Sequence, residues 1–491
     1  MSTRKLLILT SIFLGLLAFV VLYERHEPTS EERAKAARKF LDFKAEEVAS
    51  VVLERSDLPR IELRKNAGRW TLAADPPGRA DSFAADNLVS DLGRLELVGE
   101  IQTSFDPKEY GLDAPKGTVT LVFKDGSKRT VSFGKEIPGT DGTAASDGTR
   151  LGAVRFAPVA TLSKPVNEFR SKRILEGPTS DVTRITIVKG PNKVVLSRED
   201  PGGKPSGSWR IESPVADLAS SSFAERLLSD LSAAQVSDFP SLSPTDLTRV
   251  GLTPPAVQVT LQKGAEILAT LAFGAAKADA TGKAYAMDGP LVVVADDRAQ
   301  EELGKEFSAM RESRVLPVEV FRVRKVLFEA GDLRAGAEKV EGDWRSGGRV
   351  VPASAVEELV GRLSRAESRG FVARKDFAAR GVTAGQKGAK PIATIEVLEE
   401  KAEAAQVAKI WTASEAGGPA LVAAEVTGRS DALLVEAAVL DDLRRDATAL
   451  RDAALAAATP PATTPVAAPA PKALAPASPA APAAPAPPMK K

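Results

Sequence analysis

Residues 118–133 read TVTLVFKDGSKRTVSF, and this stretch decides the fold class. Its two halves, 118–123 and 128–133, are rich in β-branched and apolar residues, and the segment Lys124-Asp125-Gly126-Ser127 separates them. A glycine between two such runs supplies the positive φ angle that a tight turn requires. The stretch therefore predicts a β-hairpin, which is a unit of antiparallel sheet.

The pattern around this hairpin recurs with a period near 140 residues. A second hairpin is predicted from the runs at 257–262 and 267–273. The other recurring features are a tryptophan (Trp70, Trp209, Trp344), a glycine followed by a leucine (Tyr110-Gly111-Leu112, Val250-Gly251-Leu252) and a phenylalanine followed by a glycine (Phe133-Gly134, Phe273-Gly274). The tryptophans are 139 and 135 residues apart. One period shared by several features predicts tandem repeats.

We place the repeats at 41–177, 178–316 and 317–452. The third is divergent, because it lacks the Phe-Gly step and carries Arg380-Gly381-Val382 where the others have Gly-Leu. The linker Glu176-Gly177-Pro178 is short, which favours contacts between neighbouring repeats.

Within the first repeat, the order of elements can be predicted. Residues 48–73 favour a three-stranded meander that includes Trp70. Residues 83–97 place leucines on one face of an amphipathic helix, and 160–170 favour a closing helix. Strands grouped around helices, without strict alternation, are typical of an α+β fold. We therefore expect largely antiparallel sheets with two helices in each repeat.

The N-terminus carries a membrane signal. An uncharged apolar run of 18 residues extends from Leu6 to Tyr23, after a short N-terminal segment, 1–5, that contains Arg4 and Lys5. As a helix, the run would span roughly 27 Å, close to the thickness of the hydrocarbon core. A cleavable signal peptide would need small residues just after the run, and these are missing. We expect an uncleaved transmembrane anchor, with a cleaved signal and a buried core helix as alternatives.

Orientation is not fixed by charge alone, because basic residues flank the run on both sides. A long domain behind a short N-terminal tail is usually translocated. We therefore expect a single-pass protein of a bacterial inner membrane with its C-terminal bulk in the periplasm. Residues 24–40 are expected to form a charged stalk.

The C-terminus differs in composition from the repeats. Residues 459–491 contain eleven prolines and many alanines, and they end in Lys490-Lys491. Such a segment buries too little apolar surface to offset the entropy of ordering. We predict a disordered Ala/Pro-rich tail over 453–491.

Composition excludes several classes of site. The 491 residues contain 66 Lys+Arg and 65 Asp+Glu, so the net charge of +1 gives no basis for nucleic-acid binding. There is no Cys, and the one His, His26, lies beside the predicted anchor. Disulfides, thiolate metal sites and Ser-His-Asp triads are therefore excluded from the repeats. We predict no catalytic residue, no metal and no cofactor.

Two chemistries need neither His nor Cys: glycoside hydrolysis by paired carboxylates and acyl transfer by a Ser–Lys pair. The repeats do not share candidate acids, since Asp81 and Asp217 follow the first two tryptophans but the third is followed by Arg349-Val350-Val351-Pro352. The shared residues favour packing and turns. The candidate ligand or partner surface is therefore Trp70, Trp209 and Tyr285, although a meander tryptophan is more often core.

Arginine pairs lie near the ends of the first two repeats, at Arg170/Arg173 and Arg311/Arg314. An anion site is one interpretation of them. We expect instead that they lie on solvated helix faces.

The sequence resembles a bacterial membrane-anchored family, the domain of unknown function 4340 family. The matching features are the Trp70 strand, Tyr110-Gly111-Leu112 with Pro115, and Phe133-Gly134, with counterparts in the second repeat up to Tyr285. The resemblance covers about 41–316 well and the third repeat poorly. It implies a single-pass envelope protein with an accessory role, of a kind often encoded near ABC-type export systems. It implies no catalytic residue.

Three functions follow for testing. The first is a non-enzymatic scaffold or accessory subunit of a membrane complex, with a protein partner and an unknown oligomeric state. The second is an extracytoplasmic module that binds cell-wall polysaccharide or peptide in a cleft lined by Trp70, Trp209 or Tyr285. The third is a hydrolase with two acidic side chains about 5 to 10 Å apart in a cleft.

Overall fold

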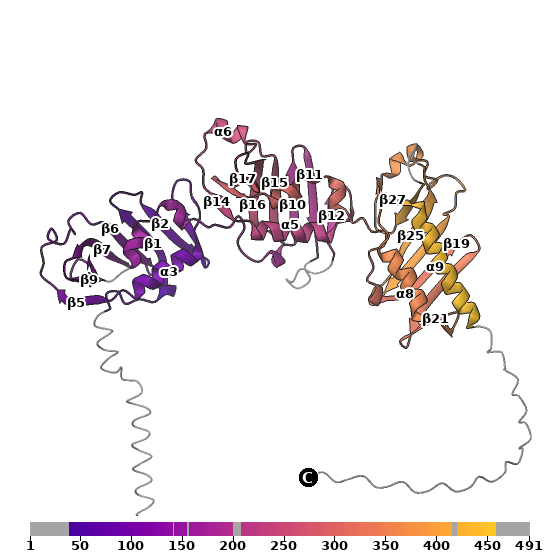
Figure 1. Cartoon of the computed structure of the whole chain (residues 1–491), viewed down its shortest axis with the longest axis horizontal. Helices are drawn as coiled ribbons and strands as arrows, with labels where there is room; N and C mark the ends of the chain where they lie inside the picture. The colour runs from indigo at the N-terminus through magenta and orange to yellow at the C-terminus, as the bar shows by residue number, and fades with distance from the viewer. Residues whose placement is uncertain (1–38, 141, 155–156, 200–207, 415–419, 458–491) are drawn as a thin grey trace, which may run out of the picture. The chain divides into compact units, whose positions relative to one another are not determined.

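The computed structural model describes residues 39–140, 142–154, 157–199, 208–414 and 420–457. The chain forms two compact units, and its strands belong to three sheets (Figure 1). Unit 1 comprises Met1–Arg314, Glu367–Ala379 and Thr427–Leu434, and unit 2 comprises Val315–Ala366, Arg380–Val426 and Val435–Lys491. The predicted anchor, most of the predicted stalk and nearly all of the predicted tail lie outside the described residues. Within the described ranges, no helix is long and apolar enough to cross a bilayer.

The first sheet contains the hairpin predicted at 118–133. Its nine strands, in spatial order, are β4 (Gly78–Arg79), β3 (Arg69–Ala73), β2 (Ile61–Asn66), β1 (Val48–Arg55), β6 (Gly117–Phe123), β7 (Lys128–Ile137), β8 (Gly142–Ser146), β9 (Leu151–Val154) and β5 (Leu97–Gln102). Neighbouring strands are antiparallel, and Val119 lies opposite Val131 in the β6–β7 hairpin. Alternate residues of β6 are buried, so one face of the sheet covers the core.

The second sheet repeats this order. Its strands are β13 (Asp217–Leu218), β12 (Arg210–Ser213), β11 (Asn192–Ser197), β10 (Arg184–Lys189), β15 (Val257–Lys263), β16 (Glu266–Ala276), β17 (Lys283–Asp288), β18 (Leu291–Asp296) and β14 (Val236–Asp238). The third sheet has the same order again: β22 (Arg349–Val350), β21 (Asp343–Ser346), β20 (Leu333–Val340), β19 (Val323–Ala330), β24 (Ala393–Glu399), β25 (Gln406–Thr412), β26 (Leu421–Val426), β27 (Ala432–Glu436) and β23 (Gly370–Val372). The tandem repeat and the antiparallel α+β class are confirmed.

The expectation of two helices in every repeat is wrong for the described residues. The α-helices are α3 (Ser82–Gly93), α4 (Ala157–Leu162), α5 (Ser221–Ala233), α6 (Pro244–Arg249), α7 (Arg298–Gly304), α8 (Ala353–Ser364) and α9 (Ala437–Ala456). The second repeat therefore has three of them. The extra helix, α6, begins with Ser243 as its cap and Pro244 in its first turn, a favourable start that hydrophobic periodicity does not reveal.

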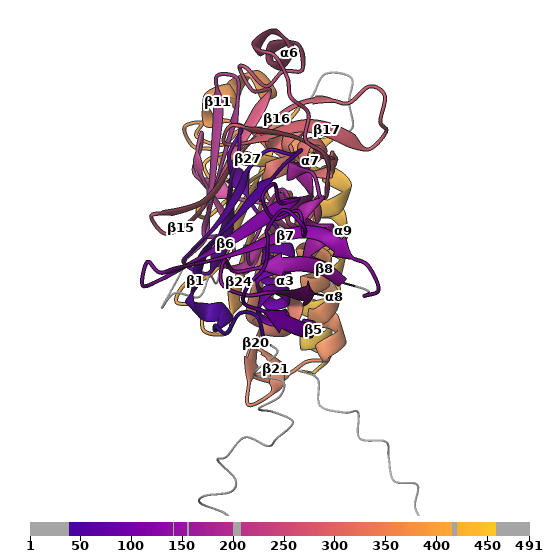
Figure 2. The same ribbon diagram turned by 90° about the vertical axis from the view of Figure 1, so that its left-hand side faces the viewer.

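Helix starts are set by short polar side chains. The Asp81 carboxylate accepts a hydrogen bond from the Ala84 N–H at 2.9 Å, and Ser220 caps α5 in the same way through Phe223. Figure 2 shows α3 beside the strands of the first sheet, where Leu88 and Leu92 of the helix join the buried core. Each of the first two sheets thus covers its own core with its own helix.

Candidate functional site

Two of the three residues of the predicted aromatic surface are buried. Trp70 and Trp209 are each 1% exposed, and Tyr285 on β17 is half-buried. The indole N–H of Trp70 donates to Asp86 Oδ1 at 2.8 Å, and the guanidinium of Arg198 lies 4.8 Å from the Trp209 ring centre. Side chains of the protein itself therefore occupy the positions that a ligand would need to stack on these indoles. The two tryptophans are core residues rather than a binding platform.

The recurring Gly-Leu and Phe-Gly steps contact each other. In the first repeat, the Lys135 N–H donates to the Tyr110 carbonyl oxygen at 2.8 Å. A Cβ on Gly134 would lie 2.0 Å from that oxygen, so only glycine allows this approach without a shift. The second repeat repeats the contact, with the Ala275 N–H and the Val250 oxygen 2.7 Å apart. These motifs are structural.

The arginine pairs differ from the expectation of solvated helix faces. Arg170 is 2% exposed and Arg311 is 5% exposed, whereas Arg173 is exposed. Both buried arginines follow short 3-10 helices, η3 (Val166–Phe169) and η6 (Phe307–Met310), and form isolated bridges with the residue after an edge strand. The helix-face expectation is therefore wrong for the first arginine of each pair.

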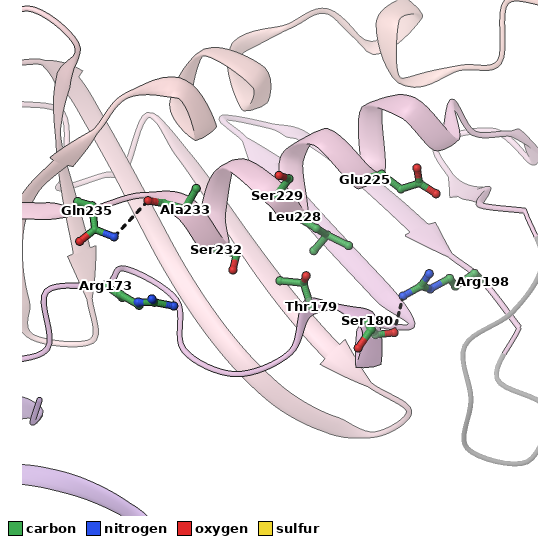
Figure 3. Close-up of a pocket in the computed structure, with 10 residues that line it drawn as sticks. All are labelled: Arg173, Thr179, Ser180, Arg198, Glu225, Leu228, Ser229, Ser232, Ala233 and Gln235. Atoms are coloured by element: carbon green, nitrogen blue, oxygen red, sulfur yellow. Dashed lines mark hydrogen bonds between the residues drawn. The ribbon is translucent and has the colours of Figure 1, made fainter. Parts of the chain in front are cut away.

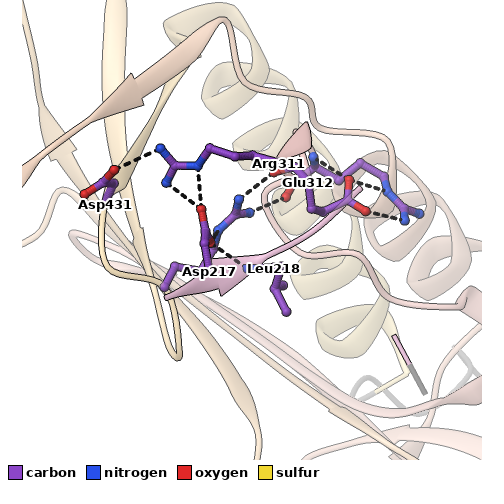
Figure 4. Close-up of polar contacts among 7 residues, drawn as sticks. Asp217, Leu218, Arg311, Glu312 and Asp431 are labelled. Carbon is purple, nitrogen blue, oxygen red and sulfur yellow. Dashed lines mark hydrogen bonds and ion pairs between the residues drawn. The ribbon is translucent and has the colours of Figure 1, made fainter. Parts of the chain in front are cut away.

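Arg311 belongs to a buried ionic cluster centred on Asp217 (Figure 4). The fully buried Asp217 carboxylate accepts hydrogen bonds from Arg311 Nε at 2.7 Å and from Arg429 Nε at 2.8 Å. Arg311 also donates from Nη1 to Asp431 at 2.9 Å, and its guanidinium carbon lies 3.8 Å from the Phe371 ring centre. All five residues lie in unit 1, where the 427–434 segment is thus fastened to the second repeat.

The electrostatics of this cluster depend on Asp217. Burial lowers the pKa of the Arg429 guanidinium, and the charge and hydrogen bond of Asp217 oppose that shift. Two buried cations around one carboxylate would be costly without further partners. Asp431 supplies a second negative charge, and Arg429 donates from Nη1 to the Arg314 carbonyl oxygen at 3.0 Å. The cluster is therefore compensated within unit 1.

The first two repeats meet through a related contact with reversed polarity. Asp217 lies opposite Ile211 in β12–β13, as Gly78 lies opposite Leu72 in β3–β4, so Gly78 is its structural counterpart. Beside Gly78, Arg79 forms an ion pair with Asp288 at 2.8 Å. In the contact between the first two repeats, the cation is Arg79 of the edge strand. In the Asp217 cluster, the edge strand supplies the carboxylate, and the following repeat supplies the cation Arg429. We call these two contacts the junctions.

At the first junction, Arg170 has no carboxylate partner among the described residues. Its Nε donates to Asn167 Oδ1 at 3.1 Å and its Nη2 to the Pro76 oxygen at 2.8 Å, while Nη1 is buried without a hydrogen-bond acceptor. The junctions are therefore related in position but not in chemistry. No set of three or more His, Cys, Asp or Glu residues in the described ranges is arranged to hold a metal ion.

The second repeat also carries an open polar groove of about 600 Å³ (Figure 3). One wall is helix α5, and the other is the segment that leads into β10. Its lining includes Arg173, Thr179, Glu225, Ser232 and Gln235. None of its described lining residues is aromatic, so it differs from the cleft lined by Trp70, Trp209 or Tyr285 that the sequence suggested.

Comparison with known proteins gives a family for this architecture. The family model described as Domain of unknown function (DUF4340) matches residues 101–239 and 209–387, which together make up more than half of the chain. The chain belongs to this family. The two matches agree with a DUF4340 domain present in repeated copies. Neither the curated proteins nor the solved structures that were compared include a significant match.

Sequence reasoning missed the main buried polar residues. Asp217 was considered only as a possible acid, and Arg429 was not singled out. One signal was present in the sequence: Asp217 aligns with Gly78 of the first repeat. A carboxylate that is buried at an edge strand requires a cation as its partner. Asp81, by contrast, corresponds to Ser220 and is a helix cap.

Proposed function

We propose that this DUF4340 protein is a non-enzymatic single-pass envelope protein that acts as a scaffold or accessory subunit of a membrane complex, one associated with an ABC-type transporter. The observation that carries the proposal is the Asp217 cluster. A buried ionic cluster adds little net stability compared with apolar packing. Its best-attested use is to specify register, which is what a scaffold requires of its junctions.

The distribution of the recurring residues supports the same role. Trp70 and Trp209 lie in the cores, and the glycine steps form close backbone contacts. The junctions connect neighbouring segments of unit 1. Proteins built from similar modules offer extended surfaces to partners. The apolar run from Leu6 to Tyr23 would tether such a surface to the inner membrane, with the bulk of the chain in the periplasm.

Replacing residues 6–23 with a cleavable signal tests the tether. The proposal predicts that the native chain sediments with membranes and that the replaced chain is released into the periplasm. A reporter fused after Lys491 should be active only if it is of a type that functions outside the cytosol. Reporter activity in the cytosol would contradict the localisation, and a native chain that stays soluble would contradict the anchor.

A second candidate function is binding of cell-wall polysaccharide or peptide. The buried tryptophans no longer support it, but the polar groove of the second repeat does. The two functions are compatible, since one uses the junctions and the other uses a surface of a single repeat.

A further inference from the structure

Three segments of equal length lead into the first long strand of each sheet. They are residues 39–48, 173–182 and 314–323. Each begins with a residue bridged to the chain just after a helix, through the pairs Lys39–Glu96, Arg173–Gln235 and Arg314–Glu367. Each ends in a 3-10 helix: η2 (Ala45–Glu47), η4 (Thr179–Asp181) or η7 (Val320–Arg322). The segments therefore align without gaps, and their fifth residues are Phe43, Gly177 and Val318.

The fifth residue carries a packed apolar side chain in the first and third repeats. In the first, the Phe43 ring lies 3.5 Å from the position of a Cβ on Gly93, at the end of α3, and packs edge-to-face on Phe123. In the third, Val318 is only 2% exposed. Both side chains are apolar and both contribute to packing.

In the second repeat this position has no side chain. Gly177 has a φ of +94°, a conformation that other residues rarely adopt, and a Cβ built there would meet no atom within 4 Å. The counterpart of Gly93 is Ser232, which lines the groove. At the fifth position the second repeat thus has glycine where the other two repeats have an apolar side chain, and at the helix position of Gly93 it has the hydroxyl of Ser232, which lines the groove.

The ends of the groove carry opposite charges. Figure 3 shows Arg173 and Gln235 at one end, Glu225 at the other, and Ser232 and Thr179 between them. Among the described residues, neither Arg173 nor Glu225 has an ion-pair partner. Both are exposed, so each can accept a charged group without paying for deep burial.

Arg198 lies at the Glu225 end of the groove, but its guanidinium already donates hydrogen bonds within the protein. Its Nε donates to the Val182 oxygen at 2.8 Å and its Nη2 to the Ser180 oxygen at 2.7 Å. Its guanidinium also stacks on Trp209. Among the described residues that line the groove, the cation with free donors is therefore Arg173, and a planar guanidinium is well suited to bind a carboxylate through two hydrogen bonds.

The spacing along α5 sets a lower limit on the ligand length. Glu225 and Ser232 are seven residues apart on α5, which corresponds to about 10 Å along the helix axis. An extended peptide covers about 3.3–3.6 Å per residue, so at least about three residues are needed, because Arg173 lies beyond Ser232, beside Gln235. Hydroxyl groups of Ser232 and Thr179 can donate to or accept from peptide groups along the way.

We propose that the groove of the second repeat binds a short peptide by both termini, with its carboxylate on Arg173 and its ammonium group on Glu225. The serine and threonine hydroxyls bind the backbone between the termini. The described lining residues include no aromatic ring, which favours a peptide over a sugar, whose apolar faces need a flat apolar surface.

Calorimetry with the purified full chain in mild detergent tests the proposal, with trialanine as the probe. Two capped probes, trialanine amide and N-acetyl-trialanine, each lack one terminal charge. We expect trialanine to bind and each cap to weaken binding at least tenfold. Arg173→Gln should abolish the discrimination against the amide, and Glu225→Gln the discrimination against the acetylated probe.

Arg226→Gln is the matched control, because Arg226 is exposed on the same helix next to Glu225 but does not line the groove. It should bind all three probes as the native chain does. Ser232→Phe, which fills the groove, should abolish binding while circular dichroism shows a folded chain. Failure of trialanine to bind at millimolar concentration would overturn the proposal, as would unchanged discrimination in Arg173→Gln. Tighter, Arg173-dependent binding of glucuronate would replace the peptide by an acidic sugar. None of these outcomes bears on the anchor or the junctions, so the scaffold proposal is tested separately.

Discussion

Substituting Asp217 by asparagine tests whether the buried cluster fastens the 427–434 segment. The substitution keeps the side-chain volume but removes the charge that faces Arg311 and Arg429. Both arginines are at most 5% exposed, so neither can regain full hydration without local opening. Removing one partner of a buried ion pair costs about 3–5 kcal/mol, much of it from the charge left unpaired.

The size of the effect can be stated for a local measurement. A loss of about 3–5 kcal/mol corresponds to roughly two to four orders of magnitude in an opening equilibrium, at about 1.4 kcal/mol for each factor of ten. Native-state hydrogen exchange reports such opening segment by segment, which suits a chain of several repeats better than one global melting temperature. We expect amides of residues 427–434 to lose protection by this factor in Asp217→Asn.

Asp246→Asn is the control, because Asp246 pairs with the exposed Arg249 at the surface of the same repeat. It should leave exchange at 427–434 unchanged. If Asp217→Asn behaved like this control, the reasoning about the cluster would be refuted. Replacing Asp217, Arg311 and Arg429 by leucine and two methionines, together with Asp431→Asn, should recover much of the lost protection, because no charge of the cluster is then left unpaired.

Further predictions concern packing and pH. Gly134→Ala should destabilise the first repeat by about 1–3 kcal/mol in urea unfolding, because its Cβ would overlap the Tyr110 oxygen, whereas Gly304→Ala should be close to neutral. Trp70→Phe should cost about 1 kcal/mol more than Trp209→Phe, because the Trp70 indole donates a hydrogen bond and the Trp209 indole has no acceptor; equal losses would contradict this. Burial would raise the pKa of Glu312, but hydrogen bonds and charge from Arg314 outweigh it and lower that pKa. The stability that the ionised Glu312 contributes should therefore be complete above the unfolded pKa of about 4.3 and be lost as pH falls through the lower folded pKa. Hydrogen exchange of residues 310–314 between pH 6 and pH 3 can follow this loss. Glu312→Gln should show no such change.

The strand pattern of each repeat was predictable because the local preference for strands and turns agrees with the alternation of buried and exposed residues that the folded sheet requires. The hairpin at 118–133 forms with Val119 opposite Val131, as the alternation of apolar residues and the glycine turn require. The helix predicted at 83–97 forms over Ser82–Gly93 because Asp81 caps its first turn. The closing helix is shorter than expected, since α4 gives way to a 3-10 turn before Arg170.

The functional surfaces were less predictable, for a physical reason. A recurring tryptophan indicates either a core or a platform, and periodicity alone does not show that Trp70 and Trp209 are buried. Arg429 pairs with Asp217 across 212 positions, a contact to which neither periodicity nor spacing points. The groove lies between α5 and the segment that leads into β10, and neither periodicity nor spacing in the sequence indicates it.

The most direct test of the scaffold role is crosslinking in intact cells, followed by purification through a tag after Lys491 and mass spectrometry. We expect a stoichiometric membrane partner with the native chain, and its loss when residues 6–23 are replaced by a cleavable signal. Asp246→Asn should retain the partner and Asp217→Asn should weaken its recovery. Recovery of wall material or soluble ligand, with no protein partner at any crosslinker concentration, would contradict the scaffold role.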